Sequence, residues 1–199
     1  MENKRIAKTL RLLSLLMELH NENPFKVKSI ANAAFKVDKL PFGLVNKSLE
    51  EIDQVEGLGK SIAAKVFELI QTGSLQELEE WLQKTPAGIV EMLQIKGIGP
   101  KKISTIWKDL GIENCGELYY ACNENRLIEA KGFGLKTQEE IKKKLEFRMA
   151  SSGRFLYATV EQFATNWMQQ LQTILTAPLA YVGAYRRRCE IIDTLDLLV

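Results

Sequence analysis

The sequence has few of the residues from which metal sites and disulfide frameworks are built. It contains three cysteines and one histidine in 199 residues, and no two cysteines stand in a C-x-x-C spacing. A structural zinc site needs about four such ligands at defined spacings, so we expect none here. We expect Cys115, Cys122 and Cys189 to be reduced thiols of a cytoplasmic protein.

Long apolar runs, flexible linkers and a strong net charge are also missing. No stretch reaches the roughly 18 consecutive apolar residues of a membrane helix, so no membrane span is expected. No Gly/Ser-rich linker interrupts the chain. The net charge is +2 and the hydrophobic fraction is 46%, which is ordinary for a globular protein. This near-neutral balance does not by itself indicate a nucleic-acid partner.

What the sequence does contain is helical periodicity. Near the N-terminus the apolar residues Ile6, Leu10, Leu13 and Met17 recur at the spacing of one helix face. This spacing predicts an amphipathic helix that packs against a core. Similar patterns predict a mainly α-helical chain, with helices over residues 3–20, 26–36, 60–72, 74–84, 88–94, 100–110, 114–122 and 135–175.

Two local patterns add detail to this outline. Ser74, with Glu77 three residues later, predicts a capping box at the start of one helix. The segments "LAYVGAYRRR" (179–188) and "TLDLLV" (194–199) are the first that favour short strands. The repeats described next place domain edges near residues 85 and 150.

One short pattern of glycine, apolar residue and glycine occurs three times. It appears as "VEGLGKSIAAKV" (55–66), "IKGIGPKKISTI" (95–106) and "AKGFGLKTQEEI" (130–141), each time followed by a helix-prone run. Glycine permits positive φ and removes the Cβ atom, so the backbone amides of the turn and of the new helix can bind a phosphate. The glycines are Gly57, Gly59, Gly97, Gly99, Gly132 and Gly134.

Lysines accompany every copy of the pattern. They are Lys60, Lys65, Lys101, Lys102, Lys131 and Lys136. For a single copy, a helical corner that uses glycine only for packing would be an equally good interpretation, and the repetition favours phosphate binding. The third copy is the weakest, because Glu139 and Glu140 bring negative charge to its helix. It is expected to serve mainly in packing.

The three turns resemble the helix-hairpin-helix motif, which grips the sugar-phosphate backbone without reading sequence. Their order and spacing, together with "NENPFKVKSIANAA" (21–34) and "GAYRRRCEIIDTLDLLV" (183–199), are similar to the N-terminal half of bacterial family X DNA polymerases. The resemblance covers essentially the whole chain. It implies a lyase-like helical domain over 1–85, a hairpin domain over 86–150, and the first strands of an α/β nucleotidyltransferase palm over 151–199.

In this family the palm carries three aspartates that hold two Mg²⁺ ions for nucleotidyl transfer. The resemblance implies that Asp196 is one of these metal ligands, and that Gly183 and Arg187 bind the incoming deoxynucleotide. Thr194 stands where the family has the first aspartate, and Ala184 where it has a serine. The third aspartate would lie beyond the last residue. We therefore expect no polymerisation by this chain alone, and we expect it to be a piece of a longer protein or a truncated relative.

The resemblance implies a second chemistry in the first domain. Lys65 falls on the lysine that forms a Schiff base with the sugar in 5′-deoxyribose-phosphate lysis, and Lys26, Lys28 and Lys60 are placed to hold the 5′-phosphate. The alternative for Lys65 is a surface lysine that contacts a phosphate. His20 falls near a histidine that stacks on template DNA in some relatives, although a surface or capping role is preferred.

The resemblance also implies a monovalent cation in the first two turns. In relatives, main-chain carbonyls of each turn share a Na⁺ or K⁺ with a DNA phosphate. The matching carbonyls belong to Asp53, Val55 and Leu58 in the first turn, and to Leu93, Ile95 and Ile98 in the second.

Three interpretations of function follow. The first is the DNA-binding half of a family X repair polymerase, which grips gapped or 5′-phosphorylated DNA without sequence preference. The second is a non-catalytic DNA-structure-binding protein with a degenerate palm. The third, a protein-protein adaptor built from helical hairpins, ranks last. In each case the chain is expected to be a monomer.

Overall fold

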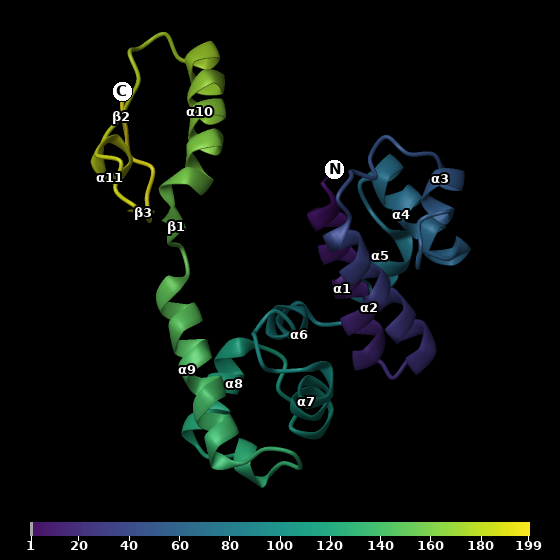
Figure 1. Ribbon diagram of the computed structural model, residues 1–199. Helices are drawn as coiled ribbons and strands as arrows, with labels where there is room; N and C mark the ends of the chain where they lie inside the picture. The colour runs from purple at the N-terminus through teal and green to yellow at the C-terminus, as the bar shows by residue number, and fades with distance from the viewer. Residues whose placement is uncertain (1) are drawn as a thin grey trace. The chain divides into compact units, whose positions relative to one another are not determined.

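The computed structural model describes residues 2–199, which form two compact units (Figure 1). The first unit extends to Leu145 and the second covers Glu146–Val199. The three-domain division with edges near residues 85 and 150 stays a prediction. None of the helices within residues 2–199 combines the length and the apolar character that a membrane span requires.

The first unit consists of helices and turns. Its elements are α1 (Asn3–Leu19), α2 (Pro24–Lys39), α3 (Leu49–Asp53), α4 (Lys60–Thr72), α5 (Gln76–Gln83), α6 (Ala87–Met92), α7 (Pro100–Ser104), the π-helical turn η1 (Thr105–Asp109), α8 (Cys115–Asn123), the 3-10 turn η2 (Leu127–Glu129) and most of α9 (Leu135–Ser151). The prediction of a mainly α-helical fold is confirmed.

Helix α1 supplies the centre of the core. Ile6, Leu10, Leu13 and Met17 are each 0% exposed, so the predicted apolar face is confirmed. The helix packs along α2 and also contacts α4, α5 and α7. Full burial of one such aliphatic side chain contributes about 1.5–3 kcal/mol to folding. This helix therefore joins the segments that carry the first and second glycine turns.

Side-chain caps occur at some helix starts in this unit, but not at the one where the sequence predicted a capping box. Ser48 and Glu51 form a reciprocal capping box at α3, a short helix that the periodicity did not predict. The capping box predicted at Ser74 was wrong, because α5 begins after Leu75 without a side-chain cap. The carboxylate of Glu77 is instead bonded to two lysines from other helices.

The second unit combines the end of one helix and two complete helices with four short strands. It contains the end of α9, then β1 (Phe155–Leu156), α10 (Tyr157–Ile174), β2 (Ala180–Tyr181), α11 (Gly183–Arg186), β3 (Ile191–Ile192) and β4 (Leu197–Leu198). β1 pairs with β3 and β2 pairs with β4, both antiparallel.

Two predictions for this unit need correction. The helix predicted over 135–175 is interrupted after Ser151, where Gly153 adopts a φ of +77° and β1 follows. Gly153 permits this interruption because it lacks a Cβ and can adopt a left-handed φ. Residues 183–186, predicted as strand, form α11, whereas the predicted strand character holds at β2 and β4.

Candidate nucleic-acid interface

The three glycine turns share one backbone conformation. The first glycine of each turn adopts a left-handed φ, with values of +85° at Gly57, +86° at Gly97 and +89° at Gly132. The residue after it donates its main-chain N–H to the carbonyl three positions earlier, from Leu58 to Val55 (2.9 Å), Ile98 to Ile95 (3.3 Å) and Phe133 to Ala130 (3.2 Å). Residues other than glycine rarely adopt this φ, so the repeated sequence encodes a repeated turn.

The second glycine of the turn has a different role. Gly59 and Gly99 are extended, with φ of −73° and −81°, and they are the N-cap residues of α4 and α7. The expectation of positive φ therefore holds only for the first glycine. Because a glycine N-cap offers no side chain to the first N–H groups of α4, those groups stay available to an anion.

The apolar residue between the glycines faces the core. Leu58, Ile98 and Phe133 are buried, with exposures of 1%, 4% and 7%. The apolar residues seven positions after each second glycine, Val66, Ile106 and Ile141, are buried as well. The glycines themselves are exposed. Each turn therefore presents backbone outward while its side chain holds it to the unit, in the third copy as in the other two.

The lysines near the turns differ in their surroundings. Lys60, Lys101, Lys131 and Lys136 are exposed. Lys102 is half-buried, and its ammonium nitrogen lies 5.8 Å from the centre of the Phe133 ring. The helix of the second turn thus contacts the apolar residue of the third, which agrees with a packing role for the third turn.

A lysine from a distant helix covers the first glycine in two of the turns. Lys36 of α2 donates from Nζ to the carbonyl oxygen of Glu56 at 3.4 Å, and a Cβ at Gly57 would overlap its side chain. Lys144 of α9 lies over Gly97, where a Cβ would come within 2.6 Å of Nζ. At Gly132 no described atom lies within 4 Å of that position. Sequence spacing carries no signal for these lysines, because they lie far from the turns along the chain.

Lys65 and Lys26 converge on Glu77. The ammonium nitrogens lie 2.6 Å and 2.8 Å from its two carboxylate oxygens, and the side chain of Lys65 is 18% exposed. Burial acts to raise the pKa of Glu77, but the hydrogen bonds from the two lysines outweigh it and hold the pKa below its ordinary value. The hydrogen bond to Glu77 also raises the pKa of Lys26. The residue predicted as an amine nucleophile is therefore engaged in an ion pair.

His20 is part of the internal packing. Its ring lies 5.0 Å from the ring of Trp81 and 5.7 Å from that of Trp107, and Nε2 is 2.8 Å from the hydroxyl of Thr85. Burial, followed by the nearby charges of Lys108 and Lys84, lowers the pKa of His20. These contacts support a structural role for His20 over stacking on DNA.

In the second unit, the predicted palm residues gather around Gly183. This glycine has a φ of +65°, and a Cβ there would overlap the carboxylate of Asp196. The hydroxyl of Thr194 lies 3.3 Å from Asp196 Oδ2. Arg187 follows one turn later and is exposed. Asp193 lines a cavity of about 410 Å³ together with Thr194, Phe155 and Phe163.

Carboxylates do not cluster in this region. Within residues 2–199, no group of three or more His, Cys, Asp or Glu side chains is arranged to hold a metal ion. Thr194, whose hydroxyl lies beside Asp196, carries no charge and does not supply a second carboxylate for a Mg²⁺. The residues present therefore do not fit a two-magnesium centre, which needs several carboxylate ligands.

Comparisons with known proteins agree with this geometry. Residues 1–75 match the family described as "Helix-hairpin-helix domain", which includes the first turn. Residues 89–146 match the family described as "SAM-like Helix-hairpin-helix tandem", which includes the second and third. The chain is 29% identical over 203 residues to "DNA polymerase/3′-5′ exonuclease PolX" of Bacillus subtilis (strain 168). That alignment covers 100% of this chain and 35% of the relative, so the chain spans about a third of the relative's length.

Proposed function

Because the chain matches the N-terminal region of a family X DNA polymerase along its whole length, we propose that it binds DNA through its helix-hairpin-helix turns, without sequence preference. The observation that carries this proposal is the turn geometry itself. Three turns place a left-handed glycine outward, and exposed lysines follow each one. A phosphate can accept hydrogen bonds from the freed amides while a lysine neutralises its charge.

Backbone recognition of this kind explains how a chain of net charge +2 can bind a polyanion. The lysines that follow the turns can supply positive charge where a phosphate would bind, so a high net charge is not required. Contacts to phosphate carry no base information, so affinity should be similar for different sequences. Each neutralised phosphate releases counterions, and affinity should therefore fall as salt rises.

We further propose that the preferred substrate is gapped or 5′-phosphorylated DNA. Lys28 and Lys60 are exposed in the first unit, and Lys26 and Lys65 meet at a single carboxylate. Two lysines that already hold one anion offer a place where a terminal phosphate can compete with Glu77. A terminal phosphate carries more charge than an internal phosphodiester, which favours it at such a site.

A monovalent cation completes the proposal for the first two turns. The carbonyl oxygens of Asp53, Val55 and Leu58, and of Leu93, Ile95 and Ile98, would hold it. Neutral carbonyl oxygens are suitable donors for Na⁺ or K⁺, as they are in ion-selective filters. The chemistry of this donor set fits the ion, whose charge would attract a phosphate oxygen to the turn.

The second unit is proposed to be the start of a nucleotidyltransferase palm in a longer repair polymerase. Gly183 and Arg187 would contact a deoxynucleotide, and Asp196 would be one metal ligand. A single carboxylate does not fit two Mg²⁺ ions, so we assign no transfer step to these residues. The same observation keeps the non-catalytic DNA-structure binder as the alternative. We place the protein in the cytoplasm, where its three free thiols are stable.

Lyase chemistry is the second candidate function. The proposed nucleophile is the amine of Lys65, which lies against Glu77. Schiff-base formation requires the free amine of Lys65 to attack the sugar aldehyde. The carboxylate at 2.6 Å must release that amine first, and it is also placed to accept a proton from it. Borohydride trapping on a 5′-deoxyribose-phosphate substrate should give an adduct that Lys65→Ala abolishes. An undiminished adduct in Lys65→Ala would remove Lys65 from this role.

The experiment that tests substrate preference is a competition among three duplexes. A gapped duplex with a 5′-phosphate at the gap should bind more tightly than the same duplex without the phosphate, and both more tightly than a blunt duplex. Lys28→Ala combined with Lys60→Ala should reduce the advantage of the phosphate, whereas Lys8→Ala combined with Lys4→Ala, on α1, should not. Equal affinity for all three duplexes would contradict the proposed preference.

A further inference from the structure

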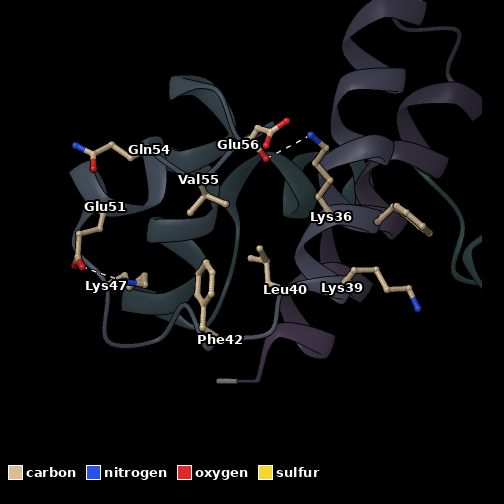
Figure 2. A pocket seen from close by; sticks show the side chains of 10 residues that line it. Lys36, Lys39, Leu40, Phe42, Lys47, Glu51, Gln54, Val55 and Glu56 are labelled. Carbon is tan, nitrogen blue, oxygen red and sulfur yellow. Dashed lines mark hydrogen bonds and ion pairs between the residues drawn. The ribbon is translucent and has the colours of Figure 1, made fainter.

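A cavity of about 570 Å³ lies beside the first hairpin turn (Figure 2). Its walls come from the end of α2, the following loop, α3 and the beginning of the turn. The lining residues are Phe35, Lys36, Lys39, Leu40, Phe42, Lys47, Glu51, Gln54, Val55 and Glu56. The proposed backbone contacts leave this cavity unused.

Two aromatic rings of the cavity are unusually exposed. Phe35 is 60% exposed and Phe42 is 43% exposed, although both are large apolar side chains. Phe42 extends into the space between Leu40 and Val55 in Figure 2. Exposing such rings costs hydrophobic free energy in the free protein, and a flat ligand that stacks on them recovers it. Aromatic rings of this kind are the stacking platforms of proteins that bind single strands.

The cavity also has a basic rim. Lys36, Lys39 and Lys47 contribute three ammonium groups, and the ammonium of Lys39 forms no hydrogen bond or ion pair within residues 2–199. Lys47 is paired with Glu51 at 3.0 Å, and Glu51 also accepts from the amide of Ser48, so the positive charge that remains at the rim is that of Lys36 and Lys39 beside the carboxylate of Glu56. Glu56 and Gln54 supply acceptors that a neutral base can use with its exocyclic amino groups.

The cavity and the hairpin share residues. Val55 and Glu56 line the cavity and also open the turn, and Lys36 bridges the two through its bond to the Glu56 carbonyl. A strand whose phosphate lies at the turn is therefore within reach of the mouth of the cavity. Figure 2 shows Lys36 and Glu56 joined at one side of the opening, with Lys39 on the same helix.

From this arrangement we propose that the cavity binds an unpaired nucleobase of the strand whose backbone the first hairpin holds. The inference deepens the proposed DNA-binding function and rests on it. Phe42 and Phe35 supply the stacking faces, and Lys39 contacts the phosphate next to the base. A paired base inside a duplex cannot enter, so the site recognises single-stranded or gapped DNA by the presence of an unstacked base.

The test compares two probes that carry the same backbone charge. Each is a duplex with a short single-stranded extension, built either from normal nucleotides or from abasic spacers. Phe42→Ala should weaken binding of the full chain to the first probe by about tenfold, and should leave binding to the abasic probe unchanged. Phe35→Ala should also weaken binding to the first probe, and Phe42→Tyr, which keeps an aromatic ring, should bind it as the wild type does. Phe147→Ala is the matched control, since that ring is 75% exposed outside the cavity.

Fluorescence of 2-aminopurine in the extension provides a second readout that does not depend on affinity. Wild type at saturation should change the fluorescence, and Phe42→Ala at saturation should not. If wild type binds DNA in a salt-sensitive way but Phe42→Ala matches it on both probes and in fluorescence, the cavity proposal is wrong and the hairpin proposal stands. If wild type binds neither probe, both proposals are wrong.

Discussion

Lys65 Nζ lies 2.6 Å from Oε2 of Glu77, and Lys26 Nζ lies 2.8 Å from the other oxygen of the same carboxylate. Two lysines expected to face a DNA phosphate thus hold an internal anion. Their charge is available to DNA only when that anion is displaced. Under the proposed function the carboxylate competes with a 5′-phosphate for these two lysines, so its removal should change DNA binding in a predictable direction.

Glu77→Gln should tighten binding to 5′-phosphorylated gapped DNA. The substitution removes a negative charge and frees two lysines, so two further phosphate contacts become available. The slope of log affinity against log salt should then become steeper by about two, at roughly 0.9 for each phosphate. Glu79→Gln, on the same helix and exposed, is the control. Weaker binding by Glu77→Gln would show that the ion pair positions the lysines instead of competing with DNA.

The free energy of unfolding should depend on pH through His20. Because burial, Lys108 and Lys84 lower its pKa below 6.5 in the folded state, the unfolded chain binds more protons there. The stability that neutral His20 contributes to the folded state is therefore fully present above pH 6.5 and is lost as the pH falls through the folded pKa. Urea titrations at a series of pH values between roughly 7.5 and 5.5 measure this loss, and the free energy of unfolding of His20→Gln should vary less with pH over that range. An unchanged pH dependence in His20→Gln would contradict this assignment.

Cys122 should be the slowest of the three thiols to react. Burial raises its pKa to about 11 from 9.0, and the side chain is 2% exposed. Because the thiolate is the nucleophile, two pKa units lower its reactive fraction about a hundredfold at neutral pH. Titration with a chromogenic disulfide should show a slow phase that urea removes and that Cys122→Ser lacks. Three equal rates in the folded protein would be inconsistent with this burial.

Primer extension by residues 1–199 is expected to be undetectable with Mg²⁺ or Mn²⁺. Asp196 has no carboxylate partner at Thr194, and nucleotidyl transfer needs two metals held by clustered carboxylates. Thr194→Asp alone should not restore activity, because the predicted third carboxylate is not supplied. A complete family X polymerase under the same conditions is the positive control. Extension by the wild-type chain would overturn this account of the palm.

Much of the first unit could be predicted because its signals are local. The periodicity of α1 identified its buried face, and the bounds of α4 follow from Gly59 at its start and Gly73, with a φ of +77°, at its end. The repeated glycine pattern specified three equivalent turns, since a left-handed φ is a property of one residue and its neighbours.

Several features that the sequence did not reveal are long-range. The ion pairs of Glu77 with Lys26 and Lys65 connect three helices. Because its carboxylate is held there, Glu77 does not form the capping box with Ser74 that their spacing predicted. Lys36 reaches Glu56 across 20 positions of sequence. Such contacts depend on helix packing, which periodicity alone does not specify.

The salt dependence of DNA affinity, measured for the wild type and for hairpin variants, is the decisive test of phosphate binding by the hairpin turns. Wild type should lose affinity steeply as salt rises. Lys60→Glu and Lys101→Glu should each weaken binding to all sequences alike and reduce the slope by about one. Lys8→Glu, an equal change in charge on α1, should leave the slope unchanged. Wild-type affinity that does not vary with salt, or equal slopes for Lys60→Glu and Lys8→Glu, would contradict phosphate binding by the hairpins.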